Sequence, residues 1–203
     1  MGIIEREIIS ALIPCLQDAD RRIRRHAAEA LERIHSVEAA EALIALAEQD
    51  GDRAARLQAI YALGRLQTAD AMAALARVVK SSHEATRAAV VRALAGSQHP
   101  QATDILLSAL EDQNPDIKIL AAEALGENPS SRVLATMRTL IRSEDPDLRL
   151  RAAQALAHAG DIRVKEVLVG FLQSEDAEVR QAAITALGTL AVEAARSAQS
   201  SAL

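Results

Sequence analysis

The residues best suited to catalysis or metal binding are few and lie far apart in the sequence. The chain contains five histidines, at His26, His35, His83, His99 and His158. None of them shows the spacing to another histidine or to a cysteine that zinc ligands on a helix require. No glycine-rich loop is present to bind a phosphate group. The sequence therefore predicts no catalytic residue, no metal site and no cofactor.

The single cysteine, Cys15, follows Pro14 in an apolar stretch, so we expect a buried structural thiol rather than a nucleophile. One cysteine cannot form an intramolecular disulfide, which fits a reducing compartment. The N-terminal residues are charged where a signal peptide would be apolar, and no stretch approaches the roughly 18 uncharged residues of a membrane span. We therefore expect a cytoplasmic protein without a membrane segment.

Basic residues form the most regular polar pattern, because one recurs every 31 or 32 residues. This basic column consists of Arg24, Arg56, Arg87, Lys118, Arg149 and Arg180. One interpretation is an anion-binding stripe, but a ligand would touch only some of these positions. We interpret each residue as structural, with its charged group paired to loop carboxylates and carbonyls and its stem packed on apolar surface.

A denser basic cluster, with four arginines, lies at residues 20–25. It contains no aromatic residue, and the whole chain has a net charge of −5 and a pI near 5.6. This acidic balance argues against a general nucleic-acid-binding protein. We interpret the cluster as the polar outer face that a terminal repeat needs, with a phosphorylated or acidic partner tail as the alternative.

An internal repeat in the sequence sets the positions of these residues along the predicted helices. An Ala-Leu pair recurs with its leucine at Leu31, Leu63, Leu94, Leu125, Leu156 and Leu187. Eleven residues before each leucine stand Asp20, Asp52, His83, Asn114, Asp145 and Asp176, nearly all of them helix-capping types. Asp and Asn accept hydrogen bonds from the free N–H groups of a first helical turn, so they predict the start of a helix. Gly64, Gly126 and Gly188 follow the leucine, where we expect them to help end that helix.

A second amphipathic stretch precedes each cap, so each repeat is a helical hairpin. One hairpin cannot bury its apolar stripe alone, and neighbours must stack on it. The sequence therefore predicts an all-α fold, a right-handed α-α superhelix (solenoid) of about six hairpins in a single domain over residues 1–192. The expected repeats are 3–35, 36–67, 68–98, 99–129, 130–160 and 161–192. Residues 193–203 are expected to form a tail or a partial seventh repeat.

The runs at residues 116–126 and 147–156 resemble the short bacterial HEAT-like repeats of the phycobilisome-lyase type. The resemblance extends from residue 4 to about 192 and implies a HEAT solenoid. In such repeats a loop Asp and a helix Arg form a hydrogen-bond ladder between adjacent units. The resemblance therefore implies that the caps at Asp20, Asp52, Asn114, Asp145 and Asp176 pair with the basic column. His83 departs from this pattern in the third repeat.

The resemblance also suggests where a partner binds. Side chains nine, six, five and two positions before the leucine point away from the core, and in HEAT solenoids that face lines the concave surface. We expect the apolar residues there to be exposed and to form an interaction patch. The expected partner-binding residues are Arg22, Arg25, Leu57, Tyr61, Arg92, Ile119, Leu120, Leu150 and Arg151.

The leading functional prediction is a non-catalytic scaffold or adaptor that binds another protein, with no nucleic acid and no membrane as partner. The alternative, implied by the family resemblance, is a phycobilin lyase-like or chromophore-handling subunit, which would bind a linear tetrapyrrole and shift its absorption. The last repeat is less polar on its outer side than a terminal repeat should be. This leaves a homodimer, or contact with a following domain, open at the C-terminal end.

Overall fold

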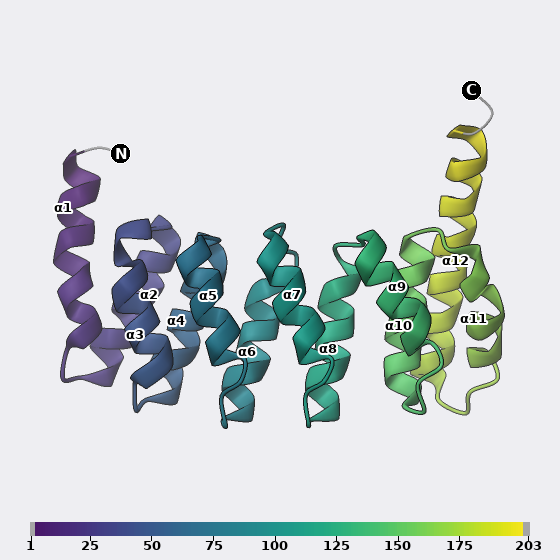
Figure 1. Cartoon of the computed structure of the whole chain (residues 1–203), viewed down its shortest axis with the longest axis horizontal. Helices are drawn as coiled ribbons and strands as arrows, with labels where there is room; N and C mark the ends of the chain where they lie inside the picture. Colours follow the sequence, from purple (N-terminus) through teal and green to yellow (C-terminus); the bar gives the residue numbers. More distant parts are fainter. Residues whose placement is uncertain (1–2, 201–203) are drawn as a thin grey trace. The chain divides into compact units, whose positions relative to one another are not determined.

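The computed structural model describes residues 3–200, and all regular secondary structure in that range is helical (Figure 1). The contacts within the chain group it into two units, Met1–Ile105 and Leu106–Leu203, which are described separately below. Twelve α-helices in the described residues agree with six helical hairpins. The predicted all-α repeat fold is confirmed.

Unit 1 contains three hairpins in two layers. Its elements are α1 (Ile3–Leu12), η1 (Ile13–Gln17), α2 (Arg21–Ile34), η2 (Val37–Ala39), α3 (Ala40–Gln49), α4 (Arg53–Leu66), α5 (Ala69–Val78) and α6 (Glu84–Leu94). The second helices pack side by side in the order α2, α4, α6, while η1, α3 and α5 form the other layer. Helix α7 (Pro100–Ala109) crosses the boundary between the units.

Unit 2 repeats this arrangement. Its elements are α8 (Pro115–Gly126), α9 (Ser131–Leu140), α10 (Pro146–His158), η3 (Ile162–Val164), α11 (Lys165–Phe171) and α12 (Ala177–Ser200). Helix α10 lies between α8 and α12 and also contacts α9 and α11. Helix α12 has 24 residues and continues past residue 192, where the sequence predicted the last repeat to end. Residues 201–203 lie outside the described part of the chain.

The second helices begin where the capping residues predicted. The side chains of Asp20, Asp52, Asn114, Asp145 and Asp176 each accept a hydrogen bond from a backbone N–H in the first turn, at 2.7 to 3.1 Å. His83 precedes α6 but makes no such bond. Because Asp and Asn carry an acceptor close to the backbone, they satisfy N–H groups that the helix itself leaves free.

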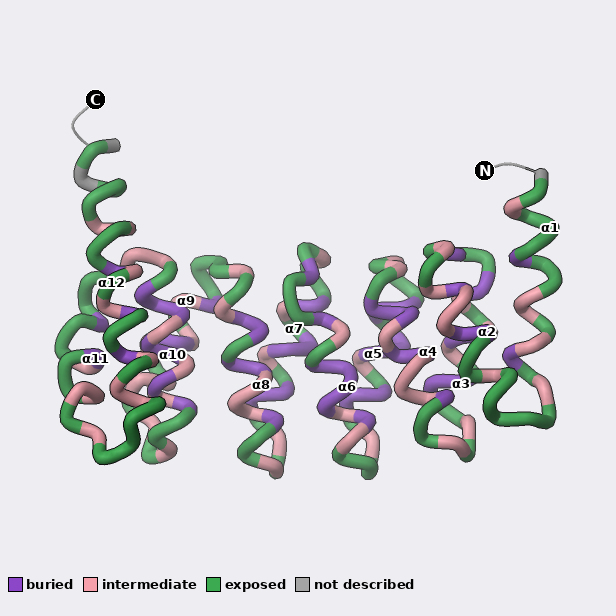
Figure 2. The backbone as a smooth tube through the Cα atoms, turned by 180° about the vertical axis from the view of Figure 1, so that it is seen from behind, coloured by how far each residue is buried: buried purple, intermediate pink, exposed green. Residues whose placement is uncertain are grey.

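The repeated leucines form the centre of the core. Five of the six, all except Leu187, are fully buried or nearly so. The residue four positions before each leucine is also buried; it is Val90 in the third repeat and an alanine in the others. Figure 2 shows buried and exposed turns alternating along the helices. Small side chains at these positions let adjacent helices approach closely, which is how a chain with only two aromatic residues obtains a packed interior.

The arginines of the basic column have one structural role in common. In each of five repeats, Nη1 donates hydrogen bonds to two backbone carbonyls of the loop before its own helix, at 2.6 to 3.4 Å. These arginines are Arg24, Arg56, Arg87, Arg149 and Arg180. The loop carbonyls have no partner in a helix, so the guanidinium satisfies acceptors that would otherwise cost free energy. The structural interpretation of the arginines is confirmed.

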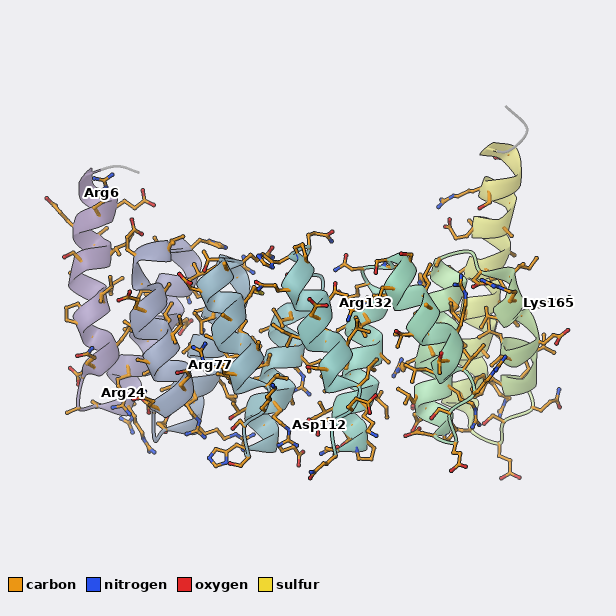
Figure 3. The ribbon with its side chains drawn as sticks, in the orientation of Figure 1. Arg6, Arg24, Arg77, Asp112, Arg132 and Lys165 are labelled. Carbon is orange, nitrogen blue, oxygen red and sulfur yellow. The ribbon has the colours of Figure 1, made fainter. Side chains whose placement is uncertain are left out.

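The carboxylate that joins the first two repeats differs from the one expected. Arg24 donates from Nε and Nη2 to the two carboxylate oxygens of Asp50, at 2.5 and 2.8 Å. The expected partner, the cap Asp52, instead accepts from the N–H of Ala55 and lies 3.5 Å from Arg21. Asp50 stands thirteen residues before the leucine rather than eleven. Arg24 lies at the lower edge of unit 1 in Figure 3, beside the loops.

We predict that Asp50→Asn destabilises the chain in a pH-dependent way. The hydrogen bond from Arg24 is the main cause that lowers the pKa of Asp50. A lowered carboxyl pKa stabilises the fold above the ordinary value of about 3.9, and this contribution is lost as pH falls through the folded-state pKa. Urea unfolding at pH 7 should show a loss of about 1.5 kcal/mol, the scale of a charge-assisted hydrogen bond. The difference from wild type should shrink below pH 4, and a difference that is constant with pH would contradict the assignment.

A second carboxylate, Asp161, organises the last loop of unit 2. It accepts from Arg138 Nε at 2.7 Å and from Arg163 Nε and Nη2, each at 2.8 Å. These hydrogen bonds, with that from Arg163 the largest cause, hold the pKa of Asp161 well below its usual range. The loop before α11 is therefore tied to α9 of the preceding repeat.

The expectation that glycine helps to end the second helices is wrong for two of three positions. Helix α4 continues past Gly64 to Leu66, and α12 continues past Gly188. A Cβ atom at Gly64 would lie 2.6 Å from the carbonyl oxygen of Ala93 on α6 and 2.9 Å from its Cβ. Gly64 therefore permits the close approach of α4 and α6, a contact that the sequence pattern alone did not reveal.

Replacing this glycine tests the close approach. We predict that Gly64→Ala lowers the free energy of unfolding by about 1–3 kcal/mol, because backbone atoms must move to relieve the overlap. The matched control is Gly188→Ala, which places the same methyl group where no atom lies within 4 Å apart from the adjacent residues and the helix's own backbone. In a helix interior that change should stabilise the fold by about 0.5–1 kcal/mol. Equal effects of the two changes in thermal or urea unfolding would contradict the packing argument.

Candidate partner-binding surface

The outer side of α2, α4 and α6 carries the expected binding residues of unit 1. We call Arg22, Arg25, Leu57, Tyr61 and Arg92 the second-helix face. The three arginines are exposed, and Leu57 and Tyr61 are half-buried between them. Since α4 packs between α2 and α6, the two apolar side chains lie on the central helix with basic residues on both flanking helices.

The arginines of this face are available for a ligand. Within the described residues, none of the side chains of Arg22, Arg25 and Arg92 donates a hydrogen bond or forms an ion pair, in contrast to the half-buried arginines of the basic column. Nearby, Gln58 donates to Glu32 at 2.6 Å, which links α4 to α2. Helices α2 and α4 are thus joined by a polar contact that leaves the arginines of the face unpaired.

The apolar part of the face is smaller than the sequence suggested. Ala88 and Ala89, which were expected to point outward on α6, are both buried. Both side chains are short, so the close packing around α6 leaves them little exposed surface. The exposed apolar surface in the middle of unit 1 therefore depends on Leu57 and Tyr61.

In unit 2 the structure corrects one of the four expected residues. Ile119 and Leu120 on α8 are half-buried, and Arg151 on α10 is half-buried and donates to Gln154 at 3.2 Å. Leu150 is only 6% exposed, so the expectation that it lies open on a monomer is wrong. Because α10 has a helix on each side, neighbouring side chains cover a position that a helical projection places outside the core.

The C-terminal end of unit 2 exposes a different apolar side chain. Ile184 is 62% exposed, whereas the residues at the same position of the other repeats are buried. Those residues are Ala28, Ile60, Val91, Ala122 and Ala153. Val192, further along α12, is also exposed. The last repeat therefore exposes an apolar side chain at a position that is buried in the five earlier repeats.

The single cysteine is less buried than the sequence suggested. Cys15 is half-buried rather than fully buried, and its Sγ lies 3.5 Å from the carbonyl oxygen of Ala11. Among the described residues, no group of three or more His, Cys, Asp or Glu side chains is placed to hold a metal ion. In the same part of the chain, no helix has the length and apolarity needed to cross a membrane.

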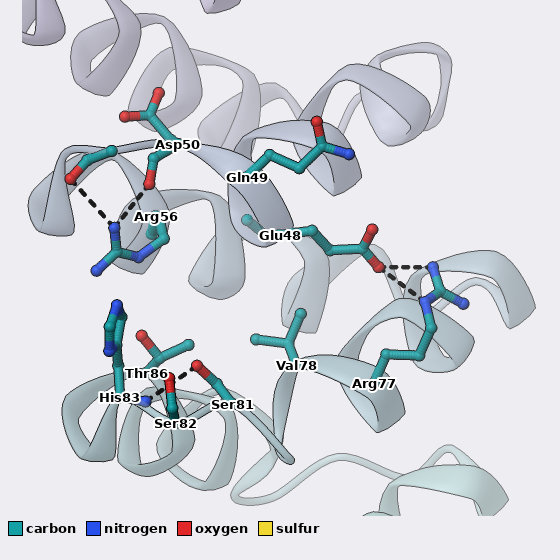
Figure 4. Close-up of a pocket in the computed structure, with 12 residues that line it drawn as sticks. Glu48, Gln49, Asp50, Arg56, Arg77, Val78, Ser81, Ser82, His83 and Thr86 are labelled. Carbon is teal, nitrogen blue, oxygen red and sulfur yellow. Dashed lines mark hydrogen bonds and ion pairs between the residues drawn. The ribbon is translucent and has the colours of Figure 1, made fainter.

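Sequence reasoning missed a hollow between the loops that precede α4 and α6 (Figure 4). It has a volume of about 560 Å³, and Arg56, His83 and Thr86 lie together at one side of it. Two sequence signals marked the place: Ser81 stands where neighbouring repeats have Asp50 and Asp112, and Thr86 stands in an otherwise apolar position. Neither signal shows a cavity until the two loops are packed together.

Comparison with known proteins agrees with the repeat architecture. A family description of HEAT repeats matches residues 2–55, 40–126, 72–145 and 134–199. No curated protein matches the chain significantly in sequence.

Three solved structures show the similarity of fold. The CpcE–CpcF complex of phycocyanin lyase from Nostoc sp. PCC7120 has 23% identity and a TM-score of 0.60, over 90% of this chain and 76% of that one. The YibA protein of E. coli has 20% identity and a TM-score of 0.64, over 91% and 71%. Designed armadillo repeat proteins for modular peptide recognition have 17% identity and a TM-score of 0.55, over 89% and 99%. With matching segments from residue 2 to residue 199 and a hairpin in every repeat, the chain belongs to the HEAT-repeat family.

Proposed function

We propose that this chain is a non-catalytic protein-binding scaffold whose second-helix face in unit 1 holds an amphipathic segment of a partner. The observation that carries the proposal is the half-buried pair Leu57 and Tyr61 between three unpaired arginines. Tyrosine and arginine are preferred anchors of protein interfaces, because one offers a rigid apolar surface and the other several directed donors. The designed relatives in fold were made to recognise peptides.

The chemistry of the face indicates what kind of segment fits. Apolar side chains of a partner helix or extended segment would cover Leu57 and Tyr61, and acidic side chains beside them would meet the arginines of α2 and α6. In unit 2, Ile119, Leu120 and Arg151 offer a second half-buried apolar and basic group, and we propose that this group binds a partner in the same way. Leu150 is buried and would support the surface from below.

Site-specific crosslinking tests the proposal. A photo-reactive phenylalanine analogue placed at Tyr61 should crosslink one protein from the native host's lysate. The same analogue at Ala73, an exposed residue on the first-helix side of unit 1, should not. Charge reversal by Arg22→Glu with Arg92→Glu should weaken binding of the purified partner by about tenfold or more, because each reversal turns attraction into repulsion.

The control for the charge reversal is Lys80→Glu, an exposed change of the same charge in the loop after α5. Its binding should equal that of wild type, and all variants should keep the helical circular dichroism spectrum. Crosslinks of equal yield from positions 61 and 73, or equal weakening by Lys80→Glu, would contradict the proposed face.

The enzymatic alternative is a phycobilin-handling role, for which the structural similarity to phycocyanin lyase subunits is the supporting observation. A similarity of fold at this level of identity carries no catalytic residue over to this chain. The alternative would require a linear tetrapyrrole to bind with a shifted absorption spectrum. We favour the scaffold because the unpaired arginines and Tyr61 are features of this chain itself.

We further propose that the exposed face of α12 pairs with a second copy of the chain. The side chains of Ile184 and Val192 are exposed, and burying this apolar surface against a second copy would favour association. Analytical ultracentrifugation of wild type should show a dimer that dissociates on dilution, and Ile184→Glu should shift the chain to monomer without loss of helicity. A monomer at all concentrations for wild type would contradict this proposal.

A further inference from the structure

The hollow between the loops before α4 and α6 lies where a structural contact of the preceding repeat is missing. In the first pair of repeats, Arg24 Nη1 binds its own loop, while its Nε and Nη2 donate to both carboxylate oxygens of Asp50. In the next pair, Arg56 Nη1 binds the carbonyls of Asp50 and Gly51 in the same manner, at 2.6 and 3.2 Å. The residue that corresponds to Asp50 is now Ser81, which has no carboxylate.

As a result, Nε and Nη2 of Arg56 lack the carboxylate that the same two groups of Arg24 bind. Arg56 Nε is buried and has no hydrogen-bond partner among the described residues. Ser81 instead uses Oγ to accept from the N–H of His83, at 3.2 Å, so it stabilises its own turn. A buried N–H group of a charged side chain without an acceptor costs free energy, which an incoming oxyanion would recover.

A second unpaired group borders the same hollow. Thr86 is 2% exposed, and its Oγ1 also has no hydrogen-bond partner among the described residues. It stands at a position that is apolar in the other repeats, at Ile23, Ala55, Ile117, Leu148 and Val179. Figure 4 shows Thr86 beside His83, with the His83 ring close to the guanidinium of Arg56. A hydroxyl in the core position is therefore directed at the same space as Arg56.

The first turn of α6 adds further donors. This helix has eleven residues, and its cap residue His83 provides no side-chain acceptor, unlike Asp52 before α4. The N–H groups at a helix start carry partial positive charge and bind anions. Together with Arg56 Nε and Thr86 Oγ1, they form a set of donors around one hollow.

The charges around the hollow favour an anion beside Arg56. Glu48 is paired with Arg77 at 2.7 Å, and Asp50 is paired with Arg24. A neighbouring hollow of about 450 Å³ continues past Arg56 and His83 and is lined by Arg53 and Glu84. Each of these two carboxylates is thus paired with an arginine, whereas Arg53 and Arg56 supply positive charge and Glu84 is the opposing carboxylate.

We propose that this hollow is a binding site for a carboxylate, which takes the place that the Asp50 side chain occupies beside Arg24. The carboxylate receives two hydrogen bonds from Arg56 Nε and Nη2, the geometry seen for Arg24, and a further one from Thr86 Oγ1. It is supplied by an acidic side chain of a protein segment or by a small carboxylic acid. This site lies at the loops and is independent of the second-helix face.

The test follows the Arg56 Nε–H signal and the amide signals of Ala85 and Thr86 by nuclear magnetic resonance of the full chain. The probes are sodium acetate, sodium phosphate and an end-blocked tripeptide with one glutamate, all at constant ionic strength. Acetate or the tripeptide should shift these signals in a saturable way. Tighter binding of the tripeptide assigns the carboxylate to a protein segment, and equal binding assigns it to a small acid.

Three variants make the test specific. Ser81→Asp restores the carboxylate within the chain, so it should abolish saturable binding and raise the midpoint of thermal unfolding. Ser174→Asp, the same change at the equivalent position of the last repeat, should leave binding unchanged. Thr86→Val removes only the hydroxyl and should weaken binding by about tenfold, the effect of one lost hydrogen bond to a charged group.

Several outcomes would overturn the proposal. Shifts that do not saturate, or that persist in Ser81→Asp, would show general ion screening rather than a site. Saturation by phosphate without saturation by acetate or the tripeptide would contradict the choice of a carboxylate. Unchanged affinity in Thr86→Val would show that the hydroxyl does not contact the carboxylate, which contradicts the role proposed for this buried unpaired group.

Discussion

The contact between a second-helix arginine and the loop before that helix is the interaction on which this structure depends. A helical hairpin needs a turn, and a turn leaves backbone carbonyls without helical partners. In five repeats a guanidinium Nη1 group satisfies two such carbonyls at once. The loop therefore has a defined path relative to its helix, and each repeat can offer its neighbour a surface of constant shape.

The Nε and Nη2 groups of the same guanidinium have partners that vary along the chain. Those of Arg24 donate to Asp50 of the next repeat, whereas the residue in the corresponding place for Arg56 is Ser81. Asp50 and Ser81 both accept the N–H of the residue two positions later, so either residue preserves the turn. Only the contact between repeats changes. A repeat protein can in this way gain a polar site at a loop without altering the packing of its helices.

Position within the stack decides which apolar side chains are open. Leu150 is buried because α10 has helices on both sides, and Ile184 is exposed although its counterparts in the other repeats are buried. In unit 1, Leu57 and Tyr61 remain half-buried on the central helix, between exposed arginines of α2 and α6. A surface of this kind, apolar in its centre and charged at its rim, is typical of protein interfaces. The chain combines it with a core built almost entirely from alanine and aliphatic residues.

The sequence by itself determined the features that arise within a few residues of one another. The period, the capping residues and the arginines of the basic column were all predicted, because a cap or an arginine-to-loop contact lies within one turn and its helix. The number of hairpins follows from that period, and the family was implied by the resemblance of the runs at residues 116–126 and 147–156 to HEAT-like repeats. The exposure of the expected binding residues was predicted only in part: Arg22, Arg25 and Arg92 are exposed and the apolar residues of the two units are half-buried, but Leu150, Ala88 and Ala89 are buried.

Only the tertiary structure decided the contacts between repeats. These include the choice of Asp50 over Asp52 as the partner of Arg24, the close approach of Ala93 to Gly64, and the hollow beside Thr86. The physical reason is that a helical projection gives the direction of a side chain but not the distance to the next helix. That distance depends on the side chains of both helices together, and no single repeat contains them.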